Sequence, residues 1–292
     1  MATPDIGKSV SEGYTRGFDR ISSWLPSLVV VGAIAGGVAA IVAVLQAQLV
    51  PNSEDLLKAV FSGDVKSLTS GKMRLVGLLS AVSSLVLFAI TFTAYAVYGG
   101  LLHRERHGEP VEAPSPNEIV GQLMKAAGNL MPKFAVLAVL VFVMQASTSL
   151  LGTVGSFLSF VALVVTVVLS VRWVYAPIIA GSGEATGDAA FERSQDTVAG
   201  NWLGTFGVLI VIGIATAIPF AIAAAIIAAI VPTAFLSSFA SSFVITAFSV
   251  PIMASAIESA WSQVEQPQHG GSVQPPAHPD STTGSDDASP FV

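Results

Sequence analysis

Long apolar runs alternate with short polar stretches along most of the chain. The runs predict six transmembrane helices, at residues 25–50, 75–102, 134–151, 156–180, 202–231 and 234–261. At about 1.5 Å per residue, runs of this length cross the roughly 30 Å of hydrocarbon in a bilayer. We therefore expect an all-α integral membrane protein with six transmembrane helices.

The polar segment before the first apolar run, residues 1–23, has its apolar positions spaced by four, four and three residues. These positions are Val10, Tyr14, Phe18 and Ile21. The spacing predicts an amphipathic helix that lies in the membrane interface. A frayed terminus is the alternative, because Gly13 and Gly17 weaken a helix.

The remaining chain divides into a membrane domain and a tail. Residues 24–265 form the expected six-span membrane domain, with a short helix at 54–61 in its first polar loop. Residues 266–292 are rich in Pro, Gly, Ser and Asp and have almost nothing to bury, so we expect a disordered polar tail.

An internal repeat is visible at the start of the first, third and fifth spans. In each place a polar helix is followed by a small or polar residue, a bulky apolar residue, and then a span and its return. Trp24, Asn129-Leu130 and Asn201-Trp202 mark the three positions. This order predicts three repeats of interfacial helix plus helical hairpin.

The composition agrees with a membrane protein and excludes several classes of function. Of the 292 residues, 52% are hydrophobic and only 11% are charged, whereas soluble domains carry about 25% charged residues. The net charge of −6 argues against nucleic acid as a partner. Because cysteine is absent, the chain has no disulfide, no thiolate metal site and no cysteine nucleophile.

Motifs for catalysis and for cofactors are also missing from the sequence. It has no nucleophile elbow, HExxH, Walker loop or dinucleotide loop in a suitable context. We therefore expect no enzyme activity, no catalytic residue and no cofactor. His103 and His107 are spaced like two metal ligands on a helix, but no third ligand is fixed by spacing, so we favour interfacial anchoring and expect no metal.

The polar residues that stand out lie near the ends of the fourth and sixth spans. They are Arg172, Tyr175, Glu184, Arg193 and Glu258. A guanidinium at the edge of hydrocarbon needs an anion, so we expect Arg172 to pair with Glu184, Glu258 or a lipid phosphate. Gln145 in the third span is expected to bond a neighbouring helix, with a substrate contact as the alternative.

Two spans contain small-residue or proline signals. Gly32 and Gly36 form a GxxxG pair, which favours close helix packing but also arises by chance in a glycine-rich span. Pro219 and Pro251 interrupt the fifth and sixth spans. The fifth span is long enough that it must tilt, kink at Pro219 or extend past the bilayer, and broken helices are where transporters bind solutes.

A family resemblance comes from residues 171–206. The order that carries it is Arg172 with an aromatic next, Ala176-Pro177, Glu184, Ala189, Ala190, Arg193-Ser194 and Gly200-Asn201. It resembles the motif of the six-helix membrane-domain family named after bacterial glycerophosphoryl diester phosphodiesterases, and of its stand-alone relatives. The resemblance implies an α-helical membrane module of largely unknown role. The family's soluble catalytic domain has no counterpart in this sequence, so phosphodiesterase activity is not carried over.

These patterns favour a non-enzymatic membrane module that organises lipid or partner proteins. The expected partners are membrane lipids, together with a membrane-protein partner or further copies of the same chain. The alternative is a transporter or channel for a small solute or lipid, which Pro219, Pro251 and Gln145 favour.

The distribution of basic residues predicts the orientation. With six spans, nine of the 13 Lys and Arg residues fall on the side of the N-terminus and four on the opposite side. The positive-inside rule then places both termini in the cytoplasm, in a multi-pass protein of the cell membrane. Cysteines introduced at Ser67 and Ser281 test this topology in whole cells. An impermeant thiol reagent added outside should label position 67 and spare position 281; the opposite pattern would reverse the topology.

Overall fold

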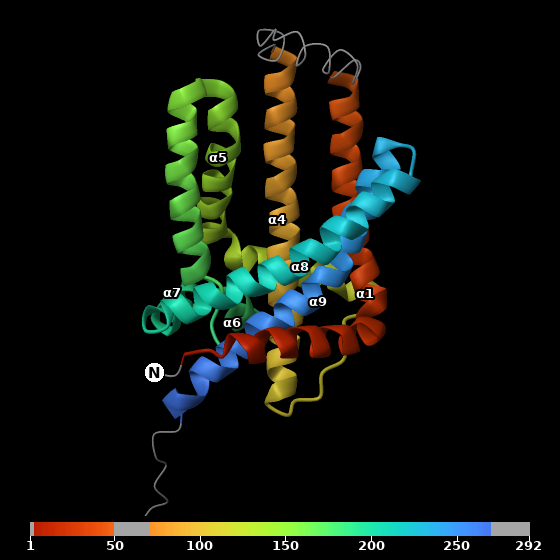
Figure 1. Cartoon of the computed structure of the whole chain (residues 1–292). Coiled ribbons are helices and arrows are strands. Elements are labelled where there is room, and N and C mark those ends of the chain that lie inside the picture. The colour runs from red at the N-terminus through yellow and green to blue at the C-terminus, as the bar shows by residue number, and fades with distance from the viewer. Residues whose placement is uncertain (1–2, 50–70, 270–292) are drawn as a thin grey trace, which may run out of the picture.

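The computed structural model describes residues 3–49 and 71–269 of the chain, and every regular element in that part is an α-helix (Figure 1). The elements are α1 (Ile6–Leu49), α4 (Gly71–Arg106), α5 (Pro116–Arg172), α6 (Ala176–Ser182), α7 (Asp188–Ala199), α8 (Trp202–Ile230) and α9 (Ala234–His269). The helix expected at 54–61 lies outside the described residues, as does the predicted tail from residue 270 onward.

Five stretches of the described helices are long and apolar enough to cross a membrane, and a bent pair within α5 makes six if it counts as one span. The predicted all-α fold with several membrane spans is therefore confirmed. The predicted spans at 75–102, 134–151 and 234–261 fall within single helices, and the described parts of those at 25–50 and 202–231 do so to within one residue. The predicted span at 156–180 runs from α5 through a turn into α6.

Helix α5 contains three parts that the sequence predicted as a polar helix and a hairpin. Pro116–Met131 meets Lys133–Met144 at 83°, and the next span begins at Val154. Figure 1 shows the chain of α5 rising and turning back on itself. The Ser159 hydroxyl donates to the carbonyl oxygen of Met144 at 2.7 Å, which joins the two arms near the turn.

Helix α1 is one continuous element, although the sequence suggested a separate N-terminal helix and a first span. Figure 1 shows its first part lying across the bundle and its second part running along it. Pro26 lies inside the helix. A proline removes one backbone hydrogen bond and bends a helix without having to end it, so the two predicted pieces form one bent helix.

A buried core lies between α1, α4 and α9, and Trp24 and Tyr98 are its aromatic members. The rings of Trp24 and Tyr98 are 5.0 Å apart, and the Tyr98 hydroxyl donates to Ser27 Oγ at 2.9 Å. Leu28 and Val250 pack into the same core. These contacts hold α4 against α1 and α9.

Helix α1 approaches α9 through four glycines, Gly13, Gly17, Gly32 and Gly36. A Cβ added at Gly17 would lie 2.7 Å from Ile252 Cα, and one at Gly36 would lie 2.8 Å from the carbonyl oxygen of Phe239. Close packing at Gly32 and Gly36 is therefore confirmed. Gly13 and Gly17, which the sequence analysis treated only as helix-weakening residues, serve the same contact.

Helices α4 and α6 touch backbone to backbone. A Cβ at Gly181 would collide with the carbonyl oxygen of Ala96, and one at Gly100 would collide with the Gly181 backbone. The short helix α6 therefore lies directly against α4, close to the end that carries Arg104. The residue after α6, Gly183, has a φ of 88°, which a glycine adopts without strain.

Pro219 and Pro251 do not break their helices, so the predicted proline breaks are wrong. Helix α8 is continuous from Trp202 to Ile230, and α9 is continuous from Ala234 to His269. Figure 1 shows α8 and α9 running obliquely to α4. A tilt of α8 in the bilayer, one of the outcomes expected for a fifth span of this length, stays a prediction.

The packing of α1 on α9 generates a matched pair of substitutions. Gly36→Ala should lower the free energy of unfolding by about 1–3 kcal/mol, because the new methyl group meets a fixed backbone oxygen. Gly37→Ala should leave it unchanged or raise it, because nothing lies within 4 Å of a Cβ there and alanine is the better helix former. Unfolding of both variants in mixed micelles compares them; equal stabilities would contradict the assigned α1–α9 contact.

Candidate functional site

A buried carboxylate lies where α1, α4 and α9 meet. Glu258 of α9 has an exposed fraction of 0%. Its Oε2 accepts hydrogen bonds from Arg16 Nη1 at 2.9 Å and from Arg106 Nη2 at 3.0 Å. Arg106 Nε is 2.9 Å from Glu258 Oε1. We call Glu258 and the charged residues linked to it the ionic cluster.

Glu12 extends the ionic cluster along α1. Its Oε2 accepts a hydrogen bond from Arg106 Nη2 at 3.0 Å and another from the Ser259 hydroxyl at 2.7 Å. Arg106 of α4 therefore contacts acidic side chains of both α1 and α9. A planar guanidinium fork is suited to serving two carboxylates at once.

His103 connects the ionic cluster to the segment between α6 and α7. Its Nδ1 is 3.8 Å from Glu258 Oε1, and its Nε2 is 2.7 Å from Glu184 Oε1. The other oxygen of Glu184 is 2.6 Å from Arg193 Nη1, and Arg193 Nη2 donates to Glu265 Oε1 at 2.7 Å. The charged residues thus form one chain of contacts through α1, α4, α7 and α9.

His103, Glu184 and Glu265 are the one group in the described part of the chain with ligand atoms close enough to share a metal ion, all within 4.8 Å of one another. However, the guanidinium of Arg193 already bridges the two carboxylates. Both carboxylates of this group are therefore already paired with a cation. His107 is directed elsewhere, since its Nδ1 is 3.0 Å from the carbonyl oxygen of His103.

The turn between the fourth span and α7 is held by Ser194. Its hydroxyl donates to the carbonyl oxygen of Arg172 at 2.8 Å and accepts the Tyr175 backbone N–H at 3.2 Å. The Tyr175 hydroxyl is 3.2 Å from Thr205 Oγ1, which adds a link to α8. Residues of the motif noted in the sequence therefore contact one another in this turn.

The Arg172 side chain does not pair with either expected carboxylate. It is exposed, and within the described residues it has no ion pair. The prediction of a pair with Glu184 or Glu258 is wrong, because His103, Arg16, Arg106 and Arg193 already occupy those carboxylates. A lipid phosphate remains the predicted partner of Arg172. The side chain of Gln145 lies outside the described part, so its expected bond stays a prediction.

Three residues of the group predicted from the sequence, Glu184, Arg193 and Glu258, belong to the ionic cluster, but most of their partners were not predicted. The residues missed are Glu12, Arg16, His103, Arg106 and Glu265. A signal was present: in a chain so poor in charge, acids and bases at the same end of neighbouring spans must find one another.

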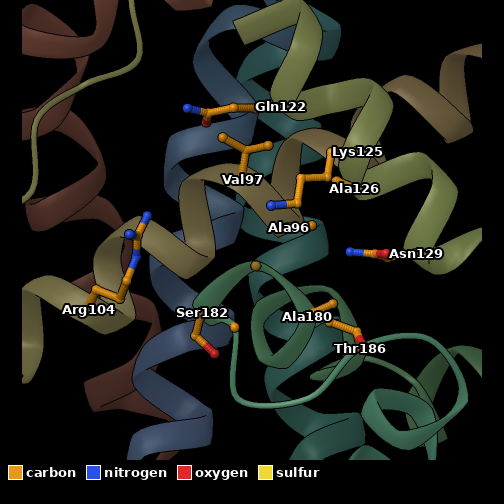
Figure 2. A pocket seen from close by; sticks show the side chains of 12 residues that line it. Ala96, Val97, Arg104, Gln122, Lys125, Ala126, Asn129, Ala180, Ser182 and Thr186 are labelled. Carbon is orange, nitrogen blue, oxygen red and sulfur yellow. The ribbon is translucent and has the colours of Figure 1, made fainter. Parts of the chain in front are cut away.

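A cavity of about 360 Å³ lies beside the ionic cluster, between α4, the first part of α5 and α6 (Figure 2). Its polar lining residues are Arg104, Gln122, Lys125, Asn129, Ser182 and Thr186. Small residues such as Ala96, Ala126 and Gly181 form the rest of the wall. Figure 2 shows side chains from all three elements around the same hollow.

Arg104 and Lys125 differ from most other basic residues in having no acidic partner. Among the basic side chains that the structure describes, Lys8, Arg16, Arg20, Arg106, Lys133 and Arg193 all form ion pairs. Arg104, Lys125 and Arg172 form none within that part of the chain, and the first two face one cavity. The Nε of Arg104 is buried and has no hydrogen-bond partner there. The cavity thus gathers two uncompensated positive charges.

The fold and these polar contacts define the chain as a multi-span helical membrane protein. Comparison with protein-family models, with curated proteins and with solved structures finds no match to the chain.

The ionic cluster generates a stability prediction. Glu258→Gln should lower the free energy of unfolding by about 3–5 kcal/mol, because two partly buried guanidinium groups lose their shared, buried anion. Unfolding in mixed micelles measures this loss. Glu192→Gln on the exposed face of α7 is the control and should stay within about 0.5 kcal/mol of the wild-type protein.

A double variant separates the ion pair from general damage to the helix. If Arg106 and Glu258 interact as the distances indicate, Arg106→Gln combined with Glu258→Gln should cost clearly less than the sum of the single changes. Additive losses would remove this pair from the account of stability.

Proposed function

We propose that this protein is a non-enzymatic membrane module that binds the phosphate headgroup of an anionic lipid in the cavity between α4, α5 and α6. The observation that carries the proposal is the pair of uncompensated cations, Arg104 and Lys125, on one cavity. A guanidinium and an ammonium donate charge-assisted hydrogen bonds to phosphate. The amide groups of Gln122 and Asn129 add neutral donors.

The cavity lining favours binding over catalysis. It contains no carboxylate and no imidazole, so it offers neither of the usual general bases. Its positive charges and neutral donors can hold an anion without changing it. This supports a role in organising lipid, and through the lipid a partner protein.

The first part of α5 supports a lipid as the source of the phosphate. Val120, Met124 and Met131 are 40%, 72% and 50% exposed and share one face of this helix. Gln122 lies two residues from Val120 and from Met124, and Asn129 lies two residues from Met131. Two residues turn an α-helix by about 200°, so these cavity-lining residues lie on the opposite face. A helix with its apolar face exposed and its polar face on the cavity is suited to the level of lipid phosphates.

The family resemblance and the orientation belong to the same proposal. The motif residues between Arg172 and Arg193 enclose α6, which supplies Ser182 to the cavity, and the loop that supplies Thr186. We therefore propose membership in the membrane-domain family named in the sequence analysis, with the cavity at the cytoplasmic leaflet. The anionic lipids of that leaflet suit a basic site.

A transporter or channel for a small solute or lipid is the second candidate function. The prolines no longer favour it, because Pro219 and Pro251 lie in continuous helices. A hollow lined by serines at the other end of the bundle does favour it.

Lipid binding by the double variant Arg104→Gln/Lys125→Gln tests the proposed function. The full chain is purified in nanodiscs that contain phosphatidylglycerol or only phosphatidylcholine, and retained lipid is measured by native mass spectrometry. We expect the wild-type protein to retain phosphatidylglycerol preferentially. The double variant should retain at least about tenfold less, since each lost charged hydrogen bond is worth about 1.5–3 kcal/mol.

Lys8→Gln is the control, because Lys8 is an exposed basic side chain that does not line the cavity. It should retain phosphatidylglycerol within about twofold of the wild-type level. Equal losses in the control and the double variant would point to nonspecific attraction of anionic lipid, and no loss in the double variant would exclude the cavity as the site.

A further inference from the structure

A second hollow lies between α1, α4, α8 and α9, at the end of the bundle opposite the ionic cluster. Its volume is about 480 Å³, within the range of small-molecule sites. It is lined by residues from the second half of α1, the first half of α4, the end of α8 and the start of α9. Six of its lining residues are Ser83, Ser84, Ser237, Ser238, Ser241 and Ser242. We call it the serine hollow.

The hydroxyl groups of these six serines have no hydrogen-bond partner among the described residues. Ser83 is nevertheless only 9% exposed. Other hydroxyl groups in the spans behave differently: Thr91, Thr166 and Thr216 donate to the carbonyl oxygen four residues earlier, at 2.7–2.8 Å. A hydroxyl group without a partner inside a membrane protein costs free energy, so these groups are suited to an occupant that bonds them.

Helix packing does not account for the serines. Small residues in membrane helices ordinarily let two backbones approach until no space is left. Gly32 and Gly36 do this between α1 and α9, with no room for an added Cβ. The serines of α9 alternate with Phe239 and Phe243, which meet those glycines, and together with Ser83 and Ser84 of α4 they line a hollow between four helices. Their small size therefore opens a space instead of closing one.

The lining also indicates the chemistry of the occupant. It carries no charged side chain, so an ion would enter without a counter-charge. Its remaining polar side chains are Gln46 and Ser80, which are joined by a hydrogen bond of 2.7 Å from Gln46 Nε2. Alanines such as Ala224 and Ala228 supply apolar wall on the α8 side. Hydroxyl groups that both donate and accept, beside apolar patches, match a molecule with alternating O–H and C–H groups.

We propose that the serine hollow binds an uncharged compound with several hydroxyl groups, such as a polyol or a sugar. A sugar free in solution and the headgroup of a neutral glycolipid present the same hydroxyl chemistry, so both are candidate sources of the ligand. This site is separate from the phosphate cavity in position, charge and ligand. It gives the protein a second binding activity that does not depend on the proposed lipid function.

Binding to the full chain in nanodiscs prepared without glycerol tests the inference. The soluble probes are glycerol and glucose, measured by saturation-transfer NMR with competition, and the lipid probe is monoglucosyl diacylglycerol, measured by native mass spectrometry. We expect saturable binding of at least one probe. The triple variant Ser83→Ala/Ser238→Ala/Ser241→Ala should weaken that binding at least about tenfold, since three hydrogen-bonding groups are lost.

The variants are chosen so that folding does not confuse the result. Alanine is a better helix former than serine, and the serine hydroxyl groups form no bond that alanine would break. Thr166→Val is the control, because its hydroxyl group is already bonded within its own helix and lies outside the hollow. It should bind within about twofold of the wild-type protein.

Each outcome decides the inference. Binding of a soluble probe alone identifies a solute site, and binding of the glycolipid alone identifies a lipid site; both support the proposal. Absence of saturable binding of all three probes, or wild-type binding by the triple variant, overturns it. The Arg104→Gln/Lys125→Gln variant should bind these probes normally, so failure of one proposed site is distinguishable from failure of the other.

Discussion

The buried carboxylate of Glu258 is the interaction on which the arrangement of the helices depends. A carboxylate removed from water is stable only when cations and hydrogen-bond donors surround it. Here the donors come from two other helices, Arg16 of α1 and Arg106 of α4. Because one acidic side chain needs both, α1, α4 and α9 must meet at the same level. His103 contacts both Glu258 and Glu184, so the segment between α6 and α7, which carries Glu184, is also held at this level.

The same constraint separates the bases of α4 into two groups. His103 and Arg106 are three residues apart and share the helical face that meets the ionic cluster. Arg104 lies about 100° from His103 around the helix and therefore faces the cavity, away from every acid of the cluster. His103 and Arg106 on one face of α4 are paired with carboxylates, whereas Arg104 on the neighbouring face has no ion pair among the described residues. The basic cavity is thus a consequence of how the cluster is built.

Hydropathy predicted the spans because a membrane helix satisfies its own backbone and is marked by a continuous apolar run. The pair of Glu184 and Arg193 was also within reach, since both residues belong to one short polar stretch. Arg16 and Arg106 were not, because their partner Glu258 is far along the chain and its position depends on how three helices pack. The predicted partners of Arg172 were wrong for the same reason. Glu184 is near Arg172 in the sequence, but in the fold other basic side chains pair with it and with Glu258. The serine hollow left no periodic signal, because serine also serves ordinary helix packing.

The contact between Gly100 and Gly181 makes the two sides of the basic cavity mechanically unequal. With backbone against backbone and no side chain between them, α6 cannot move toward α4, and it has no rotamer to change there. The opposite side is the first part of α5, which is joined to the rest of its helix at an 83° bend. The Gly100–Gly181 contact therefore fixes how closely α4 and α6 approach, so a narrower cavity would require the first part of α5 to move.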